Sequence, residues 1–329
     1  MRVALLTAGA MLSWVAIAQA QSIDSTCKSG ATEAPLIWYS SQDPARNDAA
    51  VAEFRKQYPA IKIESLRLAT GPLATRYASE RSAGVVNADV ISLADPNFIS
   101  SGQSKNWFVR LKKSELPSLS ALDDRWFENG AATTSISMLG FAYNTDAVGS
   151  DIPKRWEDIL DPKWKGRIIL GDPRSIPSYM ALFIILREKL GDEFLSKLAA
   201  QAPVVVPSVV PSTQQLAAGE IAIVIPNVMT VVRELKEQGA PINFMAPDLT
   251  TGNEFVTVMS EGSHSPNAAK CFYNFLFSQA GQVAYNGPTS VSPMGSLPGT
   301  APMPSSYIAP QITSSPSQSP AVIKLLNLK

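Results

Sequence analysis

The chain has 329 residues, with 28 Lys and Arg against 28 Asp and Glu, and 45% of its residues are hydrophobic. This charge balance gives no reason to expect nucleic acid or an anionic membrane surface as a partner. The length exceeds what one hydrophobic core usually holds, so we expect two lobes.

The first twenty residues have the pattern of a secretory signal peptide. Arg2 supplies a positive start, residues 3–18 are apolar, and Ala18-Gln19-Ala20 fits the small-x-small cleavage rule. The apolar run is too short and too rich in alanine for a membrane anchor, and no later segment is long enough to span a bilayer. We therefore expect a soluble mature chain in the periplasm, starting near Gln21.

Strands and helices alternate in the segment that follows. Asn47 is expected to cap a helix that runs to Tyr58, and Thr70-Gly71-Pro72 opens a second helix from Leu73 to Ser82. The buried strands expected around these helices are 35–40, 61–66 and 88–93. This alternation predicts a parallel α/β sheet, in which ligands lie beyond the carboxyl ends of the strands.

The second half of the chain continues the α/β pattern. Pro153–Asp172 predicts a short helix ended by Asp161-Pro162, a basic turn closed by Gly166, and a buried strand from Arg167 to Leu170. The further elements expected are a β-rich stretch at 133–144, helices at 178–190, 214–218, 229–238 and 266–278, and strands at 204–206 and 221–225. From Gly287 onward the chain is rich in proline and serine.

The two cysteines, Cys27 and Cys271, suit an exported protein. They either form a disulfide, which would tie the mature N-terminus to a late helix, or remain as two free thiols. An intracellular redox or metal role lacks the CxxC pattern that would support it.

The residues needed for catalysis are scarce. His264 is the only histidine and lies in a Gly-Ser-His-Ser-Pro stretch typical of a surface loop. There is no Gly-x-Ser-x-Gly elbow for a hydrolase, no phosphate-binding glycine loop, and no set of ligands for a usual zinc site. We expect a protein that is not an enzyme and needs no metal or other cofactor.

Polar loops at the predicted strand ends favour a binding site instead. Hydroxyls and glycines there let backbone N–H groups and helix N-termini meet a negative charge, and Arg67 and Arg174 offer bidentate donors. Taken singly, each Ser or Thr is as well explained as a helix cap or turn residue. The candidate ligand-binding residues are Ser40, Ser41, Gln42, Arg67, Thr70, Gly71, Asp95, Asp172, Arg174, Ser175, Ser178 and Tyr179.

Two stretches carry a family resemblance. Trp156-Glu-Asp-Ile-Leu-Asp-Pro-Lys-Trp-Lys-Gly-Arg167 resembles the segment that opens the second lobe of bacterial extracellular solute-binding proteins. The branch it resembles serves ABC importers for ferric iron, phosphonates, sugar phosphates, thiamine and polyamines. Ala269 to Gln282 is similar to the late helix of the first lobe in that family.

The resemblance implies an α/β, two-lobed periplasmic-binding-protein fold of type II, each lobe a mixed sheet flanked by helices. Its hinge strands would pass near Ser135 and Phe255. The implied division is a signal peptide at 1–20, lobe 1 at 21–134 plus 250–288, lobe 2 at 135–249, and a Pro/Ser-rich C-terminal wrap at 289–329. Residues 321–328 are apolar enough to dock on the surface, which favours an ordered wrap over a disordered tail.

One departure from the family bears on the ligand. Iron-binding members carry an adjacent tyrosine pair just after an Asn, and here Val228 and Met229 follow Asn227. Neither side chain offers a hard oxygen donor to Fe(III), so direct tyrosinate binding is not expected, while Asn227 remains a candidate polar contact. Asp95, Asp172 and Glu254 would supply the acidic walls that a polyamine needs, so a cationic ligand stays an alternative. The Ser/Thr/Gly loops and the two arginines favour a small organic anion.

The resemblance predicts the periplasmic binding component of an ABC transporter, working as a monomer. It would capture a phosphonate, phosphate ester or carboxylate in the interlobe cleft and deliver it to an inner-membrane permease. The alternatives are a ferric iron or polyamine receptor, an exported enzyme on the same scaffold, and a ligand-sensing partner of a membrane receptor.

Overall fold

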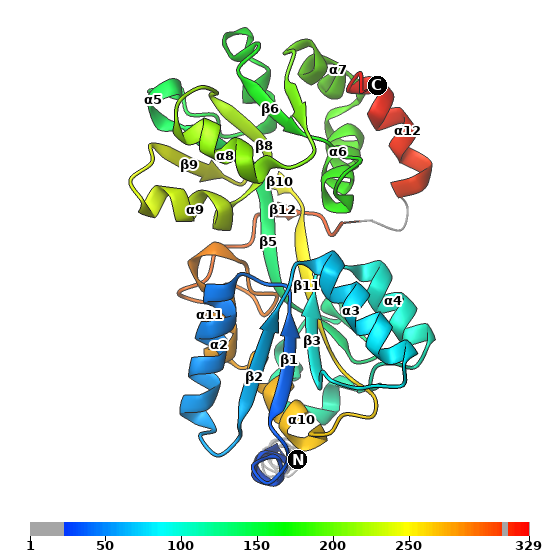
Figure 1. Cartoon of the computed structure of the whole chain (residues 1–329). Coiled ribbons are helices and arrows are strands. Elements are labelled where there is room, and N and C mark those ends of the chain that lie inside the picture. The colour runs from blue at the N-terminus through cyan, green and yellow to red at the C-terminus, as the bar shows by residue number, and fades with distance from the viewer. Residues whose placement is uncertain (1–22, 311–314, 329) are drawn as a thin grey trace, which may run out of the picture. The chain divides into compact units, whose positions relative to one another are not determined.

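The protein is described by a computed structural model that covers residues 23–310 and 315–328. The predicted signal peptide at 1–20 lies outside these residues. The chain divides into two compact units (Figure 1). Unit 1 comprises residues up to Ser135, Glu254–Pro288 and Ser292–Ala301, and unit 2 comprises Ile136–Asn253, Thr289–Val291 and the chain from Pro302.

Unit 1 is built on a sheet with the strand order β2-β1-β3-β11-β5. Its first three strands are parallel, and β11 runs antiparallel to β3. The strands are β1 (Leu36–Ser40), β2 (Ile63–Arg67), β3 (Val90–Leu93), β4 (Phe127–Glu128), β5 (Ala131–Asn144) and β11 (Gly252–Met259). The α-helices are α2 (Pro44–Gln57), α3 (Thr70–Ser82), α4 (Pro96–Ser104), α10 (Pro266–Leu276) and α11 (Gln279–Asn286), and residues 23–30 are also helical. Short 3-10 turns are Lys113–Glu115, Pro117–Ala121, Asp124–Trp126 and Gly287–Thr289.

Alternation along β1 gives this sheet its two packed faces. Trp38 points to the side of α10 and α11, where its ring lies 5.0 Å from Phe272 and 5.5 Å from Tyr285. Tyr39 points to the opposite side and packs in a cluster with Leu73 and Tyr77 of α3. Successive strand residues face opposite ways, so one strand holds two helical layers in place.

The start of α2 corrects one sequence prediction. The helix begins at Pro44, and the carboxylate of Asp43 accepts a hydrogen bond from the Ala45 N–H at 2.9 Å. Asn47 was expected to be the cap, but it lies buried within the first turn. Asp at the cap followed by Pro at the first helical position is a stronger start signal than an Asn further on.

Unit 2 has a sheet with the order β5-β8-β6-β7, and β9 also pairs with β5. Strands β6, β7 and β8 are parallel, and β5 runs antiparallel to β8. The strands are β6 (Ile168–Gly171), β7 (Val204–Val206), β8 (Ile223–Val228), β9 (Ile242–Met245), β10 (Leu249–Thr250) and β12 (Ser306–Tyr307). The helices are α5 (Thr145–Val148), α6 (Pro177–Leu190), α7 (Asp192–Ala200), α8 (Val209–Ala217), α9 (Met229–Glu237) and α12 (Ser315–Leu325), with 3-10 turns at Trp156–Leu160 and Pro162–Trp164.

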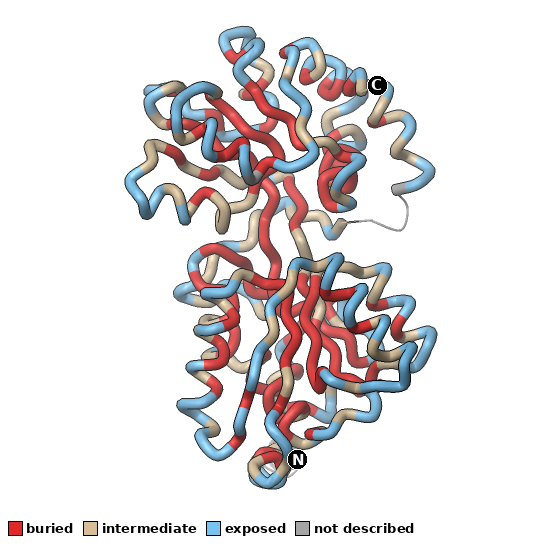
Figure 2. The backbone as a smooth tube through the Cα atoms, in the orientation of Figure 1, coloured by how far each residue is buried: buried red, intermediate tan, exposed pale blue. Residues whose placement is uncertain are grey.

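The core of unit 2 explains the two spaced tryptophans of the family-like segment. Trp156 and Trp164 are both buried, and the Trp156 ring lies 5.6 Å from Phe141 of β5. Near the C-terminus, α12 packs against α6 and α7 and buries Val322 and Leu326. Figure 2 shows that the central strands of each unit are buried, while the surrounding helices alternate between buried and exposed positions.

The two cysteines form a disulfide in unit 1. The Cys27–Cys271 bond spans a sequence separation of 244 and joins the N-terminal helix to α10. Glu33 reinforces the same junction, since its carboxylate accepts hydrogen bonds from the backbone N–H groups of Asn267 and Ala268 at the start of α10. The beginning of the chain is thus fixed to a helix formed near its end.

Candidate functional site

The carboxyl ends of three parallel strands bring the predicted unit 1 residues together. Ser40 at the end of β1 is in register with Arg67 at the end of β2 and with Ser92 of β3. Ser41 and Gln42 follow directly, and the Ser41 N–H donates to the Ser92 carbonyl at 2.9 Å. We call this group of residues, 40–42 with Arg67, Thr70 and Gly71, the unit 1 edge.

Two side chains of the unit 1 edge form hydrogen bonds that hold unit 1 together. The Ser40 hydroxyl is buried, donates to Asn47 Oδ1 at 2.8 Å and lies 3.3 Å from the Tyr285 hydroxyl. The buried Gln42 side chain donates from Nε2 to the Ser135 hydroxyl at 2.8 Å. Ser40 therefore stabilises unit 1, and Gln42 connects its edge to strand β5 at Ser135, the last residue of the first segment of the unit.

Of the other members of the unit 1 edge, Ser41 is buried, Thr70 is half-buried, and Arg67 and Gly71 are exposed. Thr70 donates its hydroxyl to Ser41 Oγ at 3.1 Å and, with Gly71, begins α3, whose N-terminus has no side-chain cap. A Cβ added to Gly71 would meet no atom within 4 Å, so the first turn of α3 is open to its surroundings. An uncapped helix start leaves backbone N–H donors that suit an anion.

Arg67 is the charged group of this edge. Its side chain is exposed, and Nε donates to the Gln42 carbonyl at 3.3 Å. Within residues 23–310 and 315–328 it forms no ion pair. Among the described residues, no carboxylate pairs with this guanidinium.

Asp95 has a structural task at the neighbouring strand end. It is the N-cap of α4, and its Oδ1 accepts a hydrogen bond from the Phe98 N–H at 3.0 Å. Sequence reasoning treated it as a possible wall for a cation. The helix that starts at Pro96 was not predicted, which is why this capping role was missed.

In unit 2, Asp172 and Arg174 follow β6 and pair with each other. Arg174 Nη2 and Nε lie 2.6 Å and 3.0 Å from Asp172 Oδ2, and the Arg174 N–H also donates to Asp172 Oδ1 at 2.8 Å. The Arg174 guanidinium lowers the pKa of the Asp172 carboxyl, and the carboxylate raises the pKa of Arg174. The two charges offset each other at this position.

The first turn of α6 completes what we call the unit 2 edge, Asp172 to Tyr179. Ser175 is exposed, whereas Ser178 is 6% exposed and its hydroxyl has no hydrogen-bond partner among the described residues. The Tyr179 ring lies against Gly171, where an added Cβ would come within 2.7 Å of the ring. Burial raises the pKa of Tyr179 to about 12, so it stays a neutral phenol at physiological pH.

Asn227, near the end of β8, is hydrogen-bonded through both polar atoms of its side chain. Its Nδ2 donates to Thr213 Oγ1 at 3.0 Å, and its Oδ1 accepts from the Val228 N–H at 2.8 Å. Thr213 was not among the predicted residues: the helix was predicted at 214–218, whereas α8 runs from Val209 to Ala217 and includes Thr213. Asn227 thus fastens α8 to β8.

Val228 ends β8 and Met229 begins α9, and neither side chain carries an oxygen donor. That these two residues stand where iron-binding members carry their tyrosine pair stays a prediction. Over the described part of the chain, no group of three or more His, Cys, Asp and Glu side chains is arranged to hold a metal ion.

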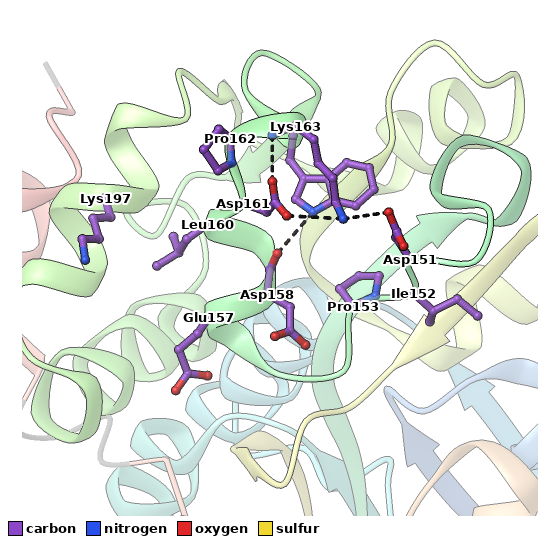
Figure 3. A pocket seen from close by; sticks show the side chains of 11 residues that line it. Asp151, Ile152, Pro153, Glu157, Asp158, Leu160, Asp161, Pro162, Lys163 and Lys197 are labelled. Carbon is purple, nitrogen blue, oxygen red and sulfur yellow. Dashed lines mark hydrogen bonds and ion pairs between the residues drawn. The ribbon is translucent and has the colours of Figure 1, made fainter.

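A separate pocket of about 790 Å³ lies beside the Trp156 segment of unit 2 (Figure 3). Its acidic side chains are partly neutralised, because Lys163 Nζ lies 3.0 Å from Asp151 and 3.3 Å from Asp161. Lys163 also stands 4.9 Å above the Trp164 ring. None of the predicted ligand-binding residues lines this pocket.

None of the helices in residues 23–310 and 315–328 combines the length and the apolar composition that a bilayer-spanning segment requires.

Comparison with known proteins gives one curated relative and many solved structures. The relative is an uncharacterised protein of Haemophilus influenzae, 30% identical over 156 residues, which are 45% of this chain and 45% of that protein. The chain therefore matches less than half of the relative's length.

The solved structures show the fold. The periplasmic binding protein AfuA from Actinobacillus pleuropneumoniae, with fructose 6-phosphate bound, matches with a TM-score of 0.63 and 19% identity, covering 90% of this chain and 99% of AfuA. Iron-bound HitA from Pseudomonas aeruginosa matches with a TM-score of 0.67 and 19% identity, covering 89% and 99%. The predicted α/β fold of the type II periplasmic binding proteins is confirmed.

The family assignment comes from the sequence itself. The profile of the bacterial extracellular solute-binding proteins matches residues 86–307, well over half of the chain. This range includes the Trp156 segment and α10, the two stretches that carried the resemblance. The chain belongs to the family of bacterial extracellular solute-binding proteins.

Proposed function

We propose that this protein is the binding component of an ABC importer and captures a small organic anion, either a phosphate ester, a phosphonate or a carboxylate. It works in the periplasm as a monomer and hands the ligand to a membrane permease. The unit 1 edge binds the charged group of the ligand. Ligand binding can shift the protein toward the form that the permease recognises only if the ligand has a higher affinity for that form.

One observation carries the choice of an anion: Arg67 is exposed and has no carboxylate partner within the described residues. A guanidinium in this state binds carboxylate or phosphate oxygens through paired N–H donors. The hydroxyl of Thr70 and the open first turn of α3 lie next to it in the chain and add neutral donors.

A cationic ligand has less support. Asp95 caps α4 and Asp172 pairs with Arg174, so both carboxylates are already engaged. Ferric iron would lack the tyrosine pair, since Val228 and Met229 occupy those positions. The solved relatives include a sugar phosphate complex and an iron complex, so the fold itself does not choose between them.

Thermal unfolding of the mature protein against a ligand panel tests this proposal. The panel contains phosphonates, sugar phosphates, carboxylates, sulfate, thiamine, polyamines and ferric citrate. A ligand at about 100 times its dissociation constant stabilises by about 2.7 kcal/mol and raises Tm by a few degrees. Stabilisation by anions is the expected result, and stabilisation by iron or polyamines alone would contradict it.

The alternative of an exported enzyme is tested by His264→Ala. His264 is exposed in the loop before α10, and its backbone N–H donates to Asp89. Ligand affinity should not change in this variant. If the wild type has a hydrolytic activity and His264→Ala loses it, the result favours the enzyme alternative.

A further inference from the structure

The pocket beside the Trp156 segment lies within unit 2 alone and has apolar walls. Its apolar side chains include Ile152, Leu160, Pro162 and Trp164. Trp164 is buried and Leu160 is half-buried. Pro162 is exposed, and Ile152 is 41% exposed, which makes it one of the few large hydrophobic side chains that the described residues leave open to solvent. This pocket therefore offers an uncovered aliphatic surface.

The charged side chains of the same pocket give it an excess of carboxylates. They are the carboxylates of Asp151, Glu157, Asp158 and Asp161 and the ammonium groups of Lys163 and Lys197. Lys163 is already held between Asp151 and Asp161. Lys197 pairs at 3.0 Å with Glu193, which does not line the pocket. Neither lysine is thus left to neutralise the remaining carboxylates.

Glu157 is the carboxylate of this pocket that the chain leaves unpaired. Its side chain is exposed and forms no ion pair or hydrogen bond within residues 23–310 and 315–328. Asp158 differs, because its Oδ2 accepts the backbone N–H groups of Lys154 and Arg155 at 2.8 Å and 2.9 Å. Figure 3 shows the contacts of Lys163 and none to Glu157. Glu157 is therefore available to a cation from outside the chain.

The pocket walls favour a protein partner over a small molecule. Small-molecule sites contain a few well-placed buried polar groups that fix the orientation of the ligand. Buried side-chain atoms without a hydrogen-bond partner do occur in the described part of the chain, but none belongs to a residue that lines this pocket. Its charges lie on exposed side chains around an exposed aliphatic residue, as in the rim and core of a protein interface.

We infer that this pocket is a surface by which the protein docks on its permease, and that the docking segment of the permease presents an arginine or lysine beside aliphatic residues. The inference rests on the proposed function, which supplies the permease as partner. The basic group pairs with Glu157, and the aliphatic residues pack on Ile152. None of the predicted ligand-binding residues lines the pocket, so permease and ligand use different residues.

Photo-crosslinking in living cells of the organism that carries the gene tests the inference without knowledge of the ligand. Ile152 is replaced by the photoreactive residue benzoylphenylalanine, and the crosslinked product is identified by mass spectrometry. The expected product joins the protein to a membrane-spanning subunit of an ABC transporter. Glu157→Lys in the same chain should lower the yield about 10-fold, because a positive charge then faces the basic group of the permease.

Two matched controls come from unit 2. Val204 is 53% exposed and does not line the pocket, so benzoylphenylalanine at this position should not capture the permease. Glu220 is exposed, forms no ion pair in the described residues and lies outside the pocket lining. Glu220→Lys makes the same change in charge and should leave the yield from position 152 within about twofold. Both charge reversals alter exposed residues, so Tm should stay within about 2 °C of the wild type.

Three results would overturn the inference and leave the proposed function intact, provided that the ligand panel identifies a stabilising anion. These are no permease product from position 152, an equal yield from position 204, or an equal loss of yield in Glu157→Lys and Glu220→Lys. No permease product from either position, together with no stabilising ligand in the panel, would contradict the proposed function as well.

Discussion

The two polar edges use the same residue type in opposite ways. In unit 1, Arg67 is exposed and no carboxylate pairs with it in the described residues. In unit 2, Arg174 lies two residues after Asp172 and is held by it at 2.6 Å. The sequence placed both arginines at strand ends with equal weight. The difference shows that the charge available to a ligand depends on the nearest carboxylate, so we assign charge recognition to unit 1 and neutral donors to unit 2.

The largest expected effect separates the stabilities of the two units. Replacing Cys27 and Cys271 by Ser removes a bond with a sequence separation of 244. On the chain-entropy model a closed loop of this length is worth about 5.5 kcal/mol, so the protein should be destabilised by up to about that amount. Hydrogen exchange should show lost protection in unit 1, which contains both cysteines, and little change in unit 2. Equal loss in both units would mean that they unfold together.

The next effect tests the assignment of charge recognition. Arg67→Gln should weaken binding of the best anion of the ligand panel about 10- to 100-fold, because an unpaired charged donor is removed. The double variant Asp172→Asn, Arg174→Gln removes a pair whose charges already cancel, and should change affinity by less than about threefold. Titration calorimetry measures the loss of anion affinity in both variants. A larger loss in the double variant than in Arg67→Gln would place charge recognition in unit 2.

Two serine substitutions compare a hydroxyl that forms buried hydrogen bonds with one that has no hydrogen-bond partner among the described residues. Ser40→Ala breaks buried hydrogen bonds to Asn47 and Tyr285 and should cost about 1–2 kcal/mol of unfolding free energy. Ser178→Ala removes a hydroxyl that has no hydrogen-bond partner among the described residues, so unfolding free energy should be unchanged or rise by up to about 1 kcal/mol. Chemical denaturation measures both. A marked loss of stability in Ser178→Ala would argue against the free hydroxyl described for α6.

The smallest effect is a pH dependence confined to the unit 2 edge. Arg174 lowers the pKa of Asp172 in the folded state, so the pair contributes stability above the unfolded pKa of about 4. That contribution is lost as the pH falls through the folded pKa. Thermal unfolding between about pH 2 and 6 should show a slightly weaker acid dependence in Asp172→Asn than in the wild type. Equal slopes would mean that the Asp172–Arg174 pair contributes nothing measurable to stability.

Much of the fold could be predicted because buried strands and turn residues leave strong local signals. The runs ending at Ser40 and Leu93 are apolar, and their strands appear at the expected places. The Trp156 segment and the α10 stretch identified the family, since their large buried side chains fix the packing of each unit. Boundaries were less certain: the cap of α2 is Asp43 rather than Asn47, and α4 was not predicted.

The state of the site residues could not be predicted for a physical reason. The sequence gives the residue types near each strand end but not which hydrogen bonds they make. Asp95 became a helix cap, Asp172 a partner of Arg174, and Asn227 a link to Thr213.

The division of the chain also has a consequence for the order of folding. Strands β6, β7, β8 and β9 and their partner segment of β5 lie between Ile136 and Met245, so the sheet of unit 2 forms from one continuous stretch. The sheet of unit 1 needs β11, and its helical layer needs α10 and α11. Because synthesis starts at the N-terminus, β1, β2 and β3 are made first, but their sheet cannot be completed until β11 has been made. Unit 2 can complete its sheet once Met245 has appeared, whereas unit 1, although it begins earlier, cannot close until Met259 follows.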